Sequence, residues 1–325
     1  MSTNSDPSPP RRLCLTCGDP AGVGPELVAA ALPHLLARGW QPLVIMPAPL
    51  LESAQQLTGL FTPFQVAPPE DRVATGQAQL WFPDQNPPDV NQGEISLEAG
   101  LIAYQSLETA VRLVQAEPQV PLVTAPVNKQ ALHLAGFRFP GQTDFLGARD
   151  NNRKTRMIMY HVDITIALAT IHLPLQEVSD HLGITVVQEA ISDLHNFLKR
   201  LGRVEPIRVL ALNPHAGEGG LFGKEEQSII TPAIAQAQAA GLTVRGPVCA
   251  DTAFNEGGCF VAMYHDQAMI PFKLIAGWQG VNVTWGLSFI RTSPDHGTAF
   301  PLAWSNRVDP ASMLAAIDLA LRLAL

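Results

Sequence analysis

Three histidines stand in short polar segments of an otherwise apolar chain, and each follows a run of residues that predicts a buried strand. In an open α/β sheet, ligands bind at the carboxyl ends of the strands. Three imidazoles brought to that edge could hold one divalent metal ion and leave further coordination positions for a substrate. The runs and the histidines that follow them are 164–169 with His172, 207–212 with His215, and 260–263 with His265.

Each histidine also has an ordinary interpretation, because a hydrogen-bonded structural histidine is more common at a strand end than a metal ligand. The three residues lie too far apart in the chain for a local motif such as H-E-x-x-H. A shared metal site therefore requires that the fold, or a second subunit, bring them together.

A second set of polar residues could bind an anion. Lys273 follows the apolar residues 270–272, Asn282 lies in the segment 280–284, and Arg291 begins a polar segment. An ammonium, an amide and a guanidinium emerging from apolar strands would suit a phosphate or a carboxylate. The alternative is that Lys273 and Arg291 are exposed, solvated strand ends.

Composition limits the function classes. A chain of 325 residues, 46% hydrophobic and 15% charged, is typical of a globular protein with two domains or one large α/β unit. Its net charge of −8 argues against a broad nucleic-acid surface. Cys14 and Cys17 form C-x-x-C along a predicted strand, which favours small buried residues over redox or zinc chemistry. No secretory signal and no bilayer-length apolar run is visible, so we expect a cytoplasmic protein.

Strand patterns that alternate with helix patterns predict a mostly parallel α/β sheet. Residues 1–12 are predicted to be a disordered tail. The Gly-rich segment 18–24 matches neither the G-x-G-x-x-G nor the P-loop template, so we interpret it as a strand-to-helix turn with N–H groups for an anion. Strands are predicted at 13–16, 42–46, 122–124, 156–160, 164–170, 207–212 and 243–248, and the main helices at 25–36, 96–114, 175–181, 186–201, 224–240 and 310–325.

Several of these motifs, in order, resemble the 4-hydroxythreonine-4-phosphate dehydrogenase family of pyridoxal-phosphate biosynthesis. The resemblance covers nearly the whole chain, and the segments that carry it are 18–26, 124–129, 213–218, 264–267 and 289–300. It implies the fold of isocitrate and isopropylmalate dehydrogenases, in which two α/β domains surround a central cleft without a classical Rossmann motif. We expect a larger domain over 13–125 and 290–325 with the dinucleotide loop, and a second over 126–289 with the metal and dimer contacts.

The resemblance also implies the residues of the site. His172, His215 and His265 would bind one divalent metal ion (zinc, magnesium or cobalt), with one ligand supplied by the neighbouring subunit of a homodimer. The substrate would contact Lys273, Asn282, Arg291, and Gln142 and Thr143 of the loop 141–144. The NAD or NADP loop would be formed by His296, Gly297, Thr298 and Ala299. The family usually has histidine where this chain has Gln142, which can hydrogen-bond but carries no charge at neutral pH.

The activity implied is oxidation of the 3-hydroxyl of 4-phosphohydroxy-L-threonine, then decarboxylation to 3-amino-2-oxopropyl phosphate, in pyridoxine 5'-phosphate biosynthesis. A divalent metal would lower the pKa of that hydroxyl, and the nicotinamide would accept hydride. Asp251, Asp266 and Lys273 are the candidate catalytic residues, and Asp266 could instead orient His265. Alternatives are a paralogous dehydrogenase of a phosphorylated four-carbon sugar acid or a dihydrodiol carboxylate, and a non-catalytic metal- or phosphate-binding protein.

Overall fold

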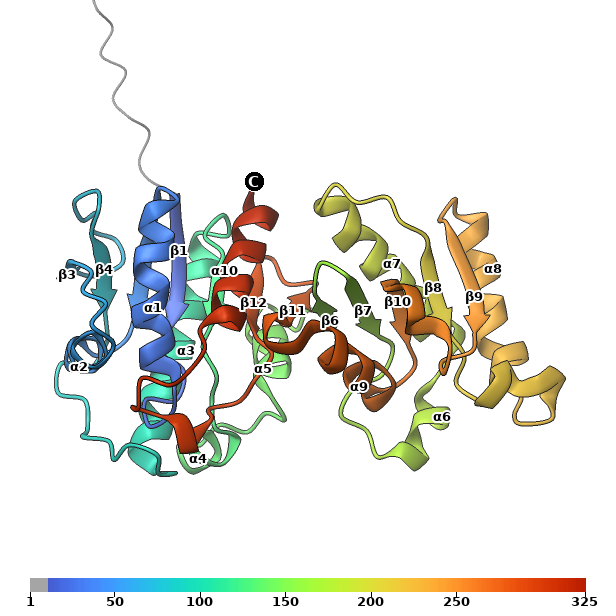
Figure 1. Cartoon of the computed structure of the whole chain (residues 1–325), viewed down its shortest axis with the longest axis horizontal. Helices are drawn as coiled ribbons and strands as arrows, with labels where there is room; N and C mark the ends of the chain where they lie inside the picture. The colour runs from blue at the N-terminus through green and yellow to red at the C-terminus, as the bar shows by residue number, and fades with distance from the viewer. Residues whose placement is uncertain (1–10) are drawn as a thin grey trace, which may run out of the picture. The chain divides into compact units, whose positions relative to one another are not determined.

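The computed structural model describes residues 11–325, which divide into two compact units (Figure 1). Unit 1 comprises the chain up to Gln142 together with Ser288–Ala324, and unit 2 comprises Thr143–Leu287. The sequence placed the two boundaries at 125/126 and 289/290. The segment after residue 125 belongs to unit 1 because its helix α4 (Lys129–Leu134) packs on α3 (Leu97–Ala116).

The predicted tail is wrong at its last two residues, and its remainder, residues 1–10, lies outside the described residues. Arg11 and Arg12 are part of the first strand, β1 (Arg11–Thr16). Arg12 is 4% exposed, and its guanidinium donates to Oε1 of Gln79 at 3.1 Å and to Oε1 of Glu117 at 3.3 Å. These polar partners allow a charged side chain in a buried strand.

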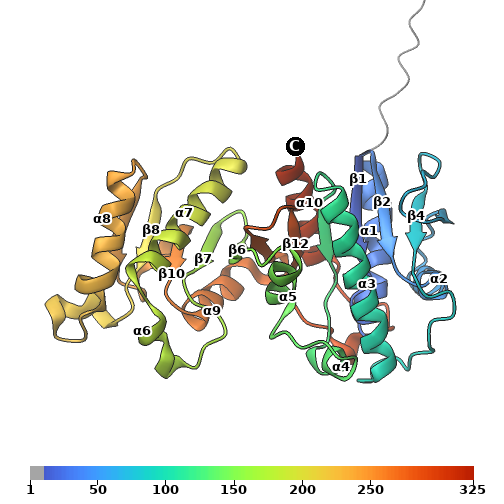
Figure 2. The same cartoon turned by 180° about the vertical axis from the view of Figure 1, so that it is seen from behind.

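Unit 1 contains a parallel stretch of sheet with helices on both faces. Helices α1 (Gly24–Ala37) and α10 (Ala311–Ala324) lie in front of its strands in Figure 1, and α3 covers the opposite face (Figure 2). Helix α2 (Ala48–Thr58) follows the second strand. The strand order is β3 (Phe64–Val66), β4 (Ala78–Trp81), β2 (Trp40–Ile45), β1, β5 (Leu122–Thr124) and β12 (Arg291–Pro294).

In unit 2, four parallel strands follow an antiparallel pair. Helix α9 (His265–Ala276) covers one face, and α7 (Ile184–Arg200) covers the other, while α8 (Thr231–Ala239) precedes the last strand of the sheet. The order is β11 (Val281–Trp285), β6 (Arg156–Tyr160), β7 (Ile164–Leu168), β10 (Gly258–Ala262), β8 (Ile207–Leu210) and β9 (Val244–Val248).

The position of Lys273 differs from the prediction. We expected it at a strand end, but it lies on α9, which continues through Pro271. A proline inside an apolar run argues against a helix because it removes one backbone donor, and this misled the sequence interpretation. Arg291 does begin a strand, β12, but it is 2% exposed rather than solvated.

The two cysteines of the C-x-x-C sequence lie in the core of unit 1. Cys14 and Cys17 are fully buried, and burial raises the pKa of each thiol to about 12, so neither is a reactive thiolate. Within residues 11–325, every helix is too short or too polar to span a bilayer.

Candidate functional site

The three histidines follow three neighbouring parallel strands. In the order β7–β10–β8, His172 comes after β7, His265 after the central strand β10, and His215 after β8. Parallel neighbours end at the same edge of a sheet, so the sheet brings all three loops to one edge, as the sequence predicted.

Hydrogen bonds join these three strand ends to one another. The hydroxyl of Thr170, after β7, donates to the carbonyl of Met263, after β10, at 2.7 Å. Gln267 accepts from the N–H of Met263 and donates through Nε2 to the carbonyl of Ala211, after β8, both at 2.7 Å. Gln267 is 9% exposed, and its amide therefore fixes the spacing between two histidine loops.

His172 and His265 face each other at this edge, with ring centroids 5.8 Å apart. Both line a cavity of about 330 Å³ together with Tyr264 and Asp266. Nδ1 of His265 lies 2.7 Å from Oδ1 of Asp266, which leaves Nε2 on the other side of the ring. A carboxylate behind an imidazole is the usual arrangement at a metal ligand, so this pair fits a divalent ion such as zinc.

His215 lies in a strained loop, 214–220, and not with this pair. Five successive residues from His215 to Gly219 have positive φ, among them the non-glycine residues His215, Ala216 and Glu218. Each non-glycine residue in this conformation costs roughly 1–2 kcal/mol, and such strain is concentrated at functional sites. The ring of His215 lies near Phe222, with centroids 6.3 Å apart. Within residues 11–325 of one chain, no three His, Cys, Asp or Glu side chains gather closely enough to hold a metal ion. The three-histidine site stays a prediction.

The three predicted catalytic residues are exposed. Asp251 lies in the turn after β9, Asp266 lies in the first turn of α9, and Lys273 lies in its last turn. Asp266 is in direct contact with a predicted ligand, His265. This contact favours the orienting role for Asp266.

Arg291 and Gln142, both in unit 1, are brought together. Nη2 of Arg291 donates to the hydroxyl of Thr124 at 2.6 Å and to Oε1 of Gln142 at 3.2 Å. Burial lowers the pKa of Arg291 to about 9, so the group still carries its charge at neutral pH. Because Oε1 of Gln142 is the end bound to Arg291, its Nε2 donors point elsewhere and suit an oxygen acceptor.

Two predicted substrate contacts belong to unit 2. Thr143 lies near the start of α5 (Gln142–Arg149), and Asn282 lies on β11. The hydroxyl of Thr143 is 3.2 Å from that of Thr284. Oδ1 of Asn282 and Oδ2 of Asp144 are buried without a hydrogen-bond partner. Buried polar atoms of this kind are rare in proteins and are typical of a site that receives a ligand. Lys273 belongs to the same unit.

The predicted cofactor loop packs on the Gly-rich turn 18–24. The N–H of Val23 donates to the carbonyl of Thr298 at 3.0 Å, and a Cβ at Gly22 would lie 2.8 Å from that oxygen. Ala299 has positive φ (44°), and Nε2 of His296 is buried without a partner. The close contact with Thr298 explains why residue 22 is glycine. The unpartnered Nε2 of His296 could form a hydrogen bond to a cofactor.

Comparison with known proteins gives the family of the chain. The family described as "Pyridoxal phosphate biosynthetic protein PdxA" matches residues 39–320. The chain belongs to this family. A D-threonate 4-phosphate dehydrogenase of Salmonella typhimurium is 39% identical over 326 residues, covering 97% of this chain and 99% of that protein. A 4-hydroxythreonine-4-phosphate dehydrogenase of Beijerinckia indica is 40% identical over 323 residues, covering 96% and 94%.

Solved structures confirm the fold class. The crystal structure of 4-hydroxythreonine-4-phosphate dehydrogenase from Klebsiella pneumoniae matches with a TM-score of 0.82 at 35% identity, covering 97% of this chain and 100% of that chain. An isocitrate dehydrogenase from Methylococcus capsulatus has a TM-score of 0.52 at 12% identity, covering 96% and 85%, and so shares the fold alone. The chain is thus a PdxA-family dehydrogenase, and membership implies a nicotinamide cofactor.

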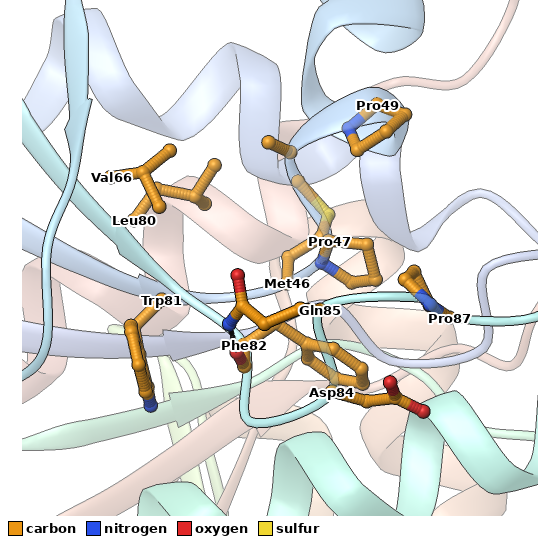
Figure 3. Close-up of a pocket in the computed structure, with 11 residues that line it drawn as sticks. Met46, Pro47, Pro49, Val66, Leu80, Trp81, Phe82, Asp84, Gln85 and Pro87 are labelled. Carbon is orange, nitrogen blue, oxygen red and sulfur yellow. Dashed lines mark hydrogen bonds between the residues drawn. The ribbon is translucent and has the colours of Figure 1, made fainter.

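A smaller cavity of about 120 Å³ in unit 1 of this PdxA-family chain contains none of the predicted site residues (Figure 3). It lies where β2 and β4 end, and Met46, Pro47, Trp81 and Phe82 form much of its wall. Its lining is mainly apolar, with Asp84 and Gln85 as the polar members.

Two carboxylates hold the Gly-rich turn through contacts that the sequence did not predict. Glu26, in the first turn of α1, accepts from the N–H groups of Trp304 and Asn306 at 2.6 and 2.8 Å. Oδ1 of Asp19 accepts from the N–H of Ala21 at 2.9 Å, while Oδ2 is buried without a partner. A carboxylate at a helix start is readable from sequence, but its contact across almost the whole chain is not.

Asp19 gives a pH-dependent prediction. Burial raises its pKa from 3.8 to about 6. Between about pH 4 and 6 the folded chain keeps the Asp19 proton that the unfolded chain has lost, so its contribution to the free energy of unfolding falls as pH rises. We expect Asp19→Asn to unfold at higher urea concentration than the native chain at pH 7.5, with a smaller difference at pH 5. An equal difference at both pH values would contradict the buried-charge assignment.

Proposed function

We propose that this PdxA-family dehydrogenase oxidises the 3-hydroxyl of a phosphorylated four-carbon 3-hydroxy acid with NAD or NADP, and that the resulting β-keto acid loses CO₂. The observation that carries the proposal is the His172–His265 pair, 5.8 Å apart, in a cavity at the carboxyl edge of a parallel sheet. Loss of hydride from C3 and of the hydroxyl proton gives the ketone, and decarboxylation leaves an enolate that takes up one proton.

Each part of the chain then has a defined task. His172 and His265, with His215, would hold a divalent metal, and Asp266 keeps the ring of His265 oriented. When bound, the metal supplies charge that lowers the pKa of the substrate hydroxyl, and the nicotinamide supplies a hydride acceptor. The loop 296–299 would hold the cofactor. Asp251 and Lys273 are the candidates to exchange a proton at the substrate.

Anion binding falls to the second set of residues. Arg291 presents a buried guanidinium held by Thr124, and Gln142 presents its Nε2 donors. Lys273, Asn282 and Thr143 of unit 2 are the other candidates for contact with the phosphate or the carboxylate of a small acid. A guanidinium fixed in a dry site loses little freedom on binding, so its contribution to affinity is large.

Two substrates satisfy this chemistry and differ only at C2. We propose 4-phosphohydroxy-L-threonine, which carries an amino group there and gives 3-amino-2-oxopropyl phosphate in pyridoxine 5'-phosphate biosynthesis. The second candidate is D-threonate 4-phosphate, which carries a hydroxyl and would give dihydroxyacetone phosphate. The relatives are divided between the two activities: the D-threonate 4-phosphate dehydrogenase of Salmonella typhimurium is 39% identical and the 4-hydroxythreonine-4-phosphate dehydrogenase of Beijerinckia indica is 40% identical.

A substrate panel tests the proposal. The chain is mixed with each compound and NAD⁺ or NADP⁺, and reduction is followed at 340 nm while CO₂ is measured. We expect reduction and equal CO₂ release with at least one of the two phosphorylated acids, and none with their dephosphorylated forms. Activity confined to a dihydrodiol carboxylate, or no turnover with any compound, would sink the proposal.

A homodimer is part of the proposal. Helix α9 and the turn after it expose three large apolar side chains, Ile270 (62%), Leu274 (81%) and Trp278 (72%), at helical spacing. Exposed apolar groups of this size on one face are typical of a protein interface. The same helix carries His265 and Lys273, so a second copy docked here would lie beside the site.

The interface gives a direct prediction. Leu274→Glu would place a charge among apolar contacts, so we expect light scattering to show a shift from dimer towards monomer, with a parallel loss of turnover. The matched control is Val162→Glu, since Val162 is also exposed (66%) but lies in the turn between β6 and β7, away from α9 and from the histidine cavity. A Leu274→Glu chain that stays dimeric would rule out this face as the interface.

A further inference from the structure

A buried glutamate supports the loop that carries His215. Glu226 is 3% exposed, and its Oε1 accepts from the backbone N–H groups of Leu212 and Asn213 at 2.9 and 2.8 Å. Its Oε2 accepts from Nδ2 of Asn213 at 3.0 Å. One carboxylate therefore satisfies three donors immediately before the left-handed loop 214–220 begins.

The loop is shaped around this carboxylate. Gly217 has a φ of +77°, and a Cβ added there would lie 2.7 Å from Oε2 of Glu226. Glycine is thus required twice, for its backbone conformation and for the close approach of the side chain. Glu226 also opens a π-helical turn, Glu226–Ile230, a local irregularity that is frequent at functional sites.

The preceding residue extends the contact to a second histidine loop. Oε1 of Glu225 accepts from the hydroxyl of Ser179 at 2.7 Å, and Oε2 accepts from Nδ2 of Asn213 at 2.8 Å. Ser179 lies in α6 (Val178–His181), in the segment that follows His172. The hydrogen bond from Ser179 is the main cause that lowers the pKa of Glu225, so this carboxylate is ionised at neutral pH.

We propose that Glu226 and Glu225 are positioning residues that hold His215 in the place required for metal binding and fix its loop relative to the segment after His172. Asn213 links the two carboxylates, because its Nδ2 donates a hydrogen bond to each of them. The inference rests on the proposed function, in which His215 is a metal ligand. In this inference the two carboxylates stabilise the strained backbone of the loop 214–220 without contacting the metal.

Cobalt binding is the test that separates positioning from general support of the fold. Native chain, Glu226→Gln and the control Glu256→Gln are titrated with Co²⁺, and the visible absorption is recorded. We expect Glu226→Gln to bind Co²⁺ about 10- to 100-fold more weakly with a changed spectrum, the scale seen when a group behind a ligand is altered. The exposed Glu256 should leave both readouts native. A folded Glu226→Gln chain with native affinity and spectrum would overturn the inference.

Two further measurements keep the inference testable. If Glu226→Gln does not fold, the more exposed Glu225→Gln is titrated instead, and here a loss of Co²⁺ affinity supports the inference and native affinity refutes it. If the native chain binds no Co²⁺, the proposed function fails by itself. Hydrogen exchange then decides the positioning claim: faster exchange at residues 212–220 in Glu226→Gln supports it, and unchanged exchange refutes it.

Discussion

Replacing His265 with alanine should lower kcat/KM by roughly 10³-fold, the scale lost when a group that stabilises transition-state charge is removed. The same loss is expected for His172→Ala, because the two rings face each other at 5.8 Å across one cavity. Thermal unfolding should change little, since His172 is exposed and His265 only half-buried. Steady-state NADH formation at 340 nm and a melting curve on the same samples provide the measurement.

His181→Ala is the matched control for this pair. His181 is an exposed histidine of the same unit, and its Nδ1 contacts the carbonyl of Glu177 at 2.8 Å, outside the cavity. Its replacement should leave kcat/KM within about two-fold, as expected for a surface change. Full activity in both His172→Ala and His265→Ala would remove the metal mechanism.

Arg291→Lys should raise KM for the phosphorylated substrate by about 10- to 100-fold with a smaller change in kcat, since a hydrogen bond to a charged group contributes about 1.5–3 kcal/mol. Lysine keeps the charge but replaces the planar guanidinium, whose Nη2 donates to both Thr124 and Gln142, with a single ammonium that cannot bind an anion in a bidentate way. We expect KM to change more than kcat because the anion is bound equally well in the ground state and in the transition state.

Arg245→Lys serves as the control for Arg291→Lys. Arg245 lies on β9 and is exposed, so its replacement should leave KM unchanged. If Arg291→Lys retained the native KM for both phosphorylated acids, Arg291 would not belong to the anion site.

The sequence predicted the sheet edge that carries the three histidines, but it did not predict the contacts that support this edge. Apolar runs before His172, His215 and His265 predicted strands that the structure contains, because buried parallel strands read as continuous apolar segments. The order β7–β10–β8 could not be read, since sequence pattern does not specify which strands are neighbours. Helix α9 was missed because Pro271 interrupts its pattern.

The supporting carboxylates show the same limit. In the sequence, Glu26 is readable only as a carboxylate at a helix start, and Glu225 and Glu226 look like ordinary residues of a helical segment. Each gains its role from contacts made after folding: Glu26 accepts from Trp304 and Asn306, and Glu226 from the residues before His215. For Glu225 and Glu226 the local signal was glycine, because a Cβ at Gly223 or Gly217 would lie 2.7 Å from their carboxylate oxygens.

Gln142 illustrates a case in which the sequence raised the correct question. Its replacement of the histidine usual in the family indicated altered substrate contact, and the structure adds that its oxygen is held by Arg291. The amide therefore presents donors at every pH, whereas a histidine would change charge near neutrality. Substrate preference between an amino group and a hydroxyl at C2 is where we expect this difference to appear.

Metal removal and restoration test the central claim most directly. The chain is treated with a chelator, freed of it, and assayed for NAD⁺ reduction with 4-phosphohydroxy-L-threonine and with D-threonate 4-phosphate before and after addition of Zn²⁺, Mg²⁺ or Co²⁺. We predict that chelation abolishes turnover, that at least one cation restores it, and that the His172→Ala chain is not restored. Turnover that survives chelation unchanged would contradict the account.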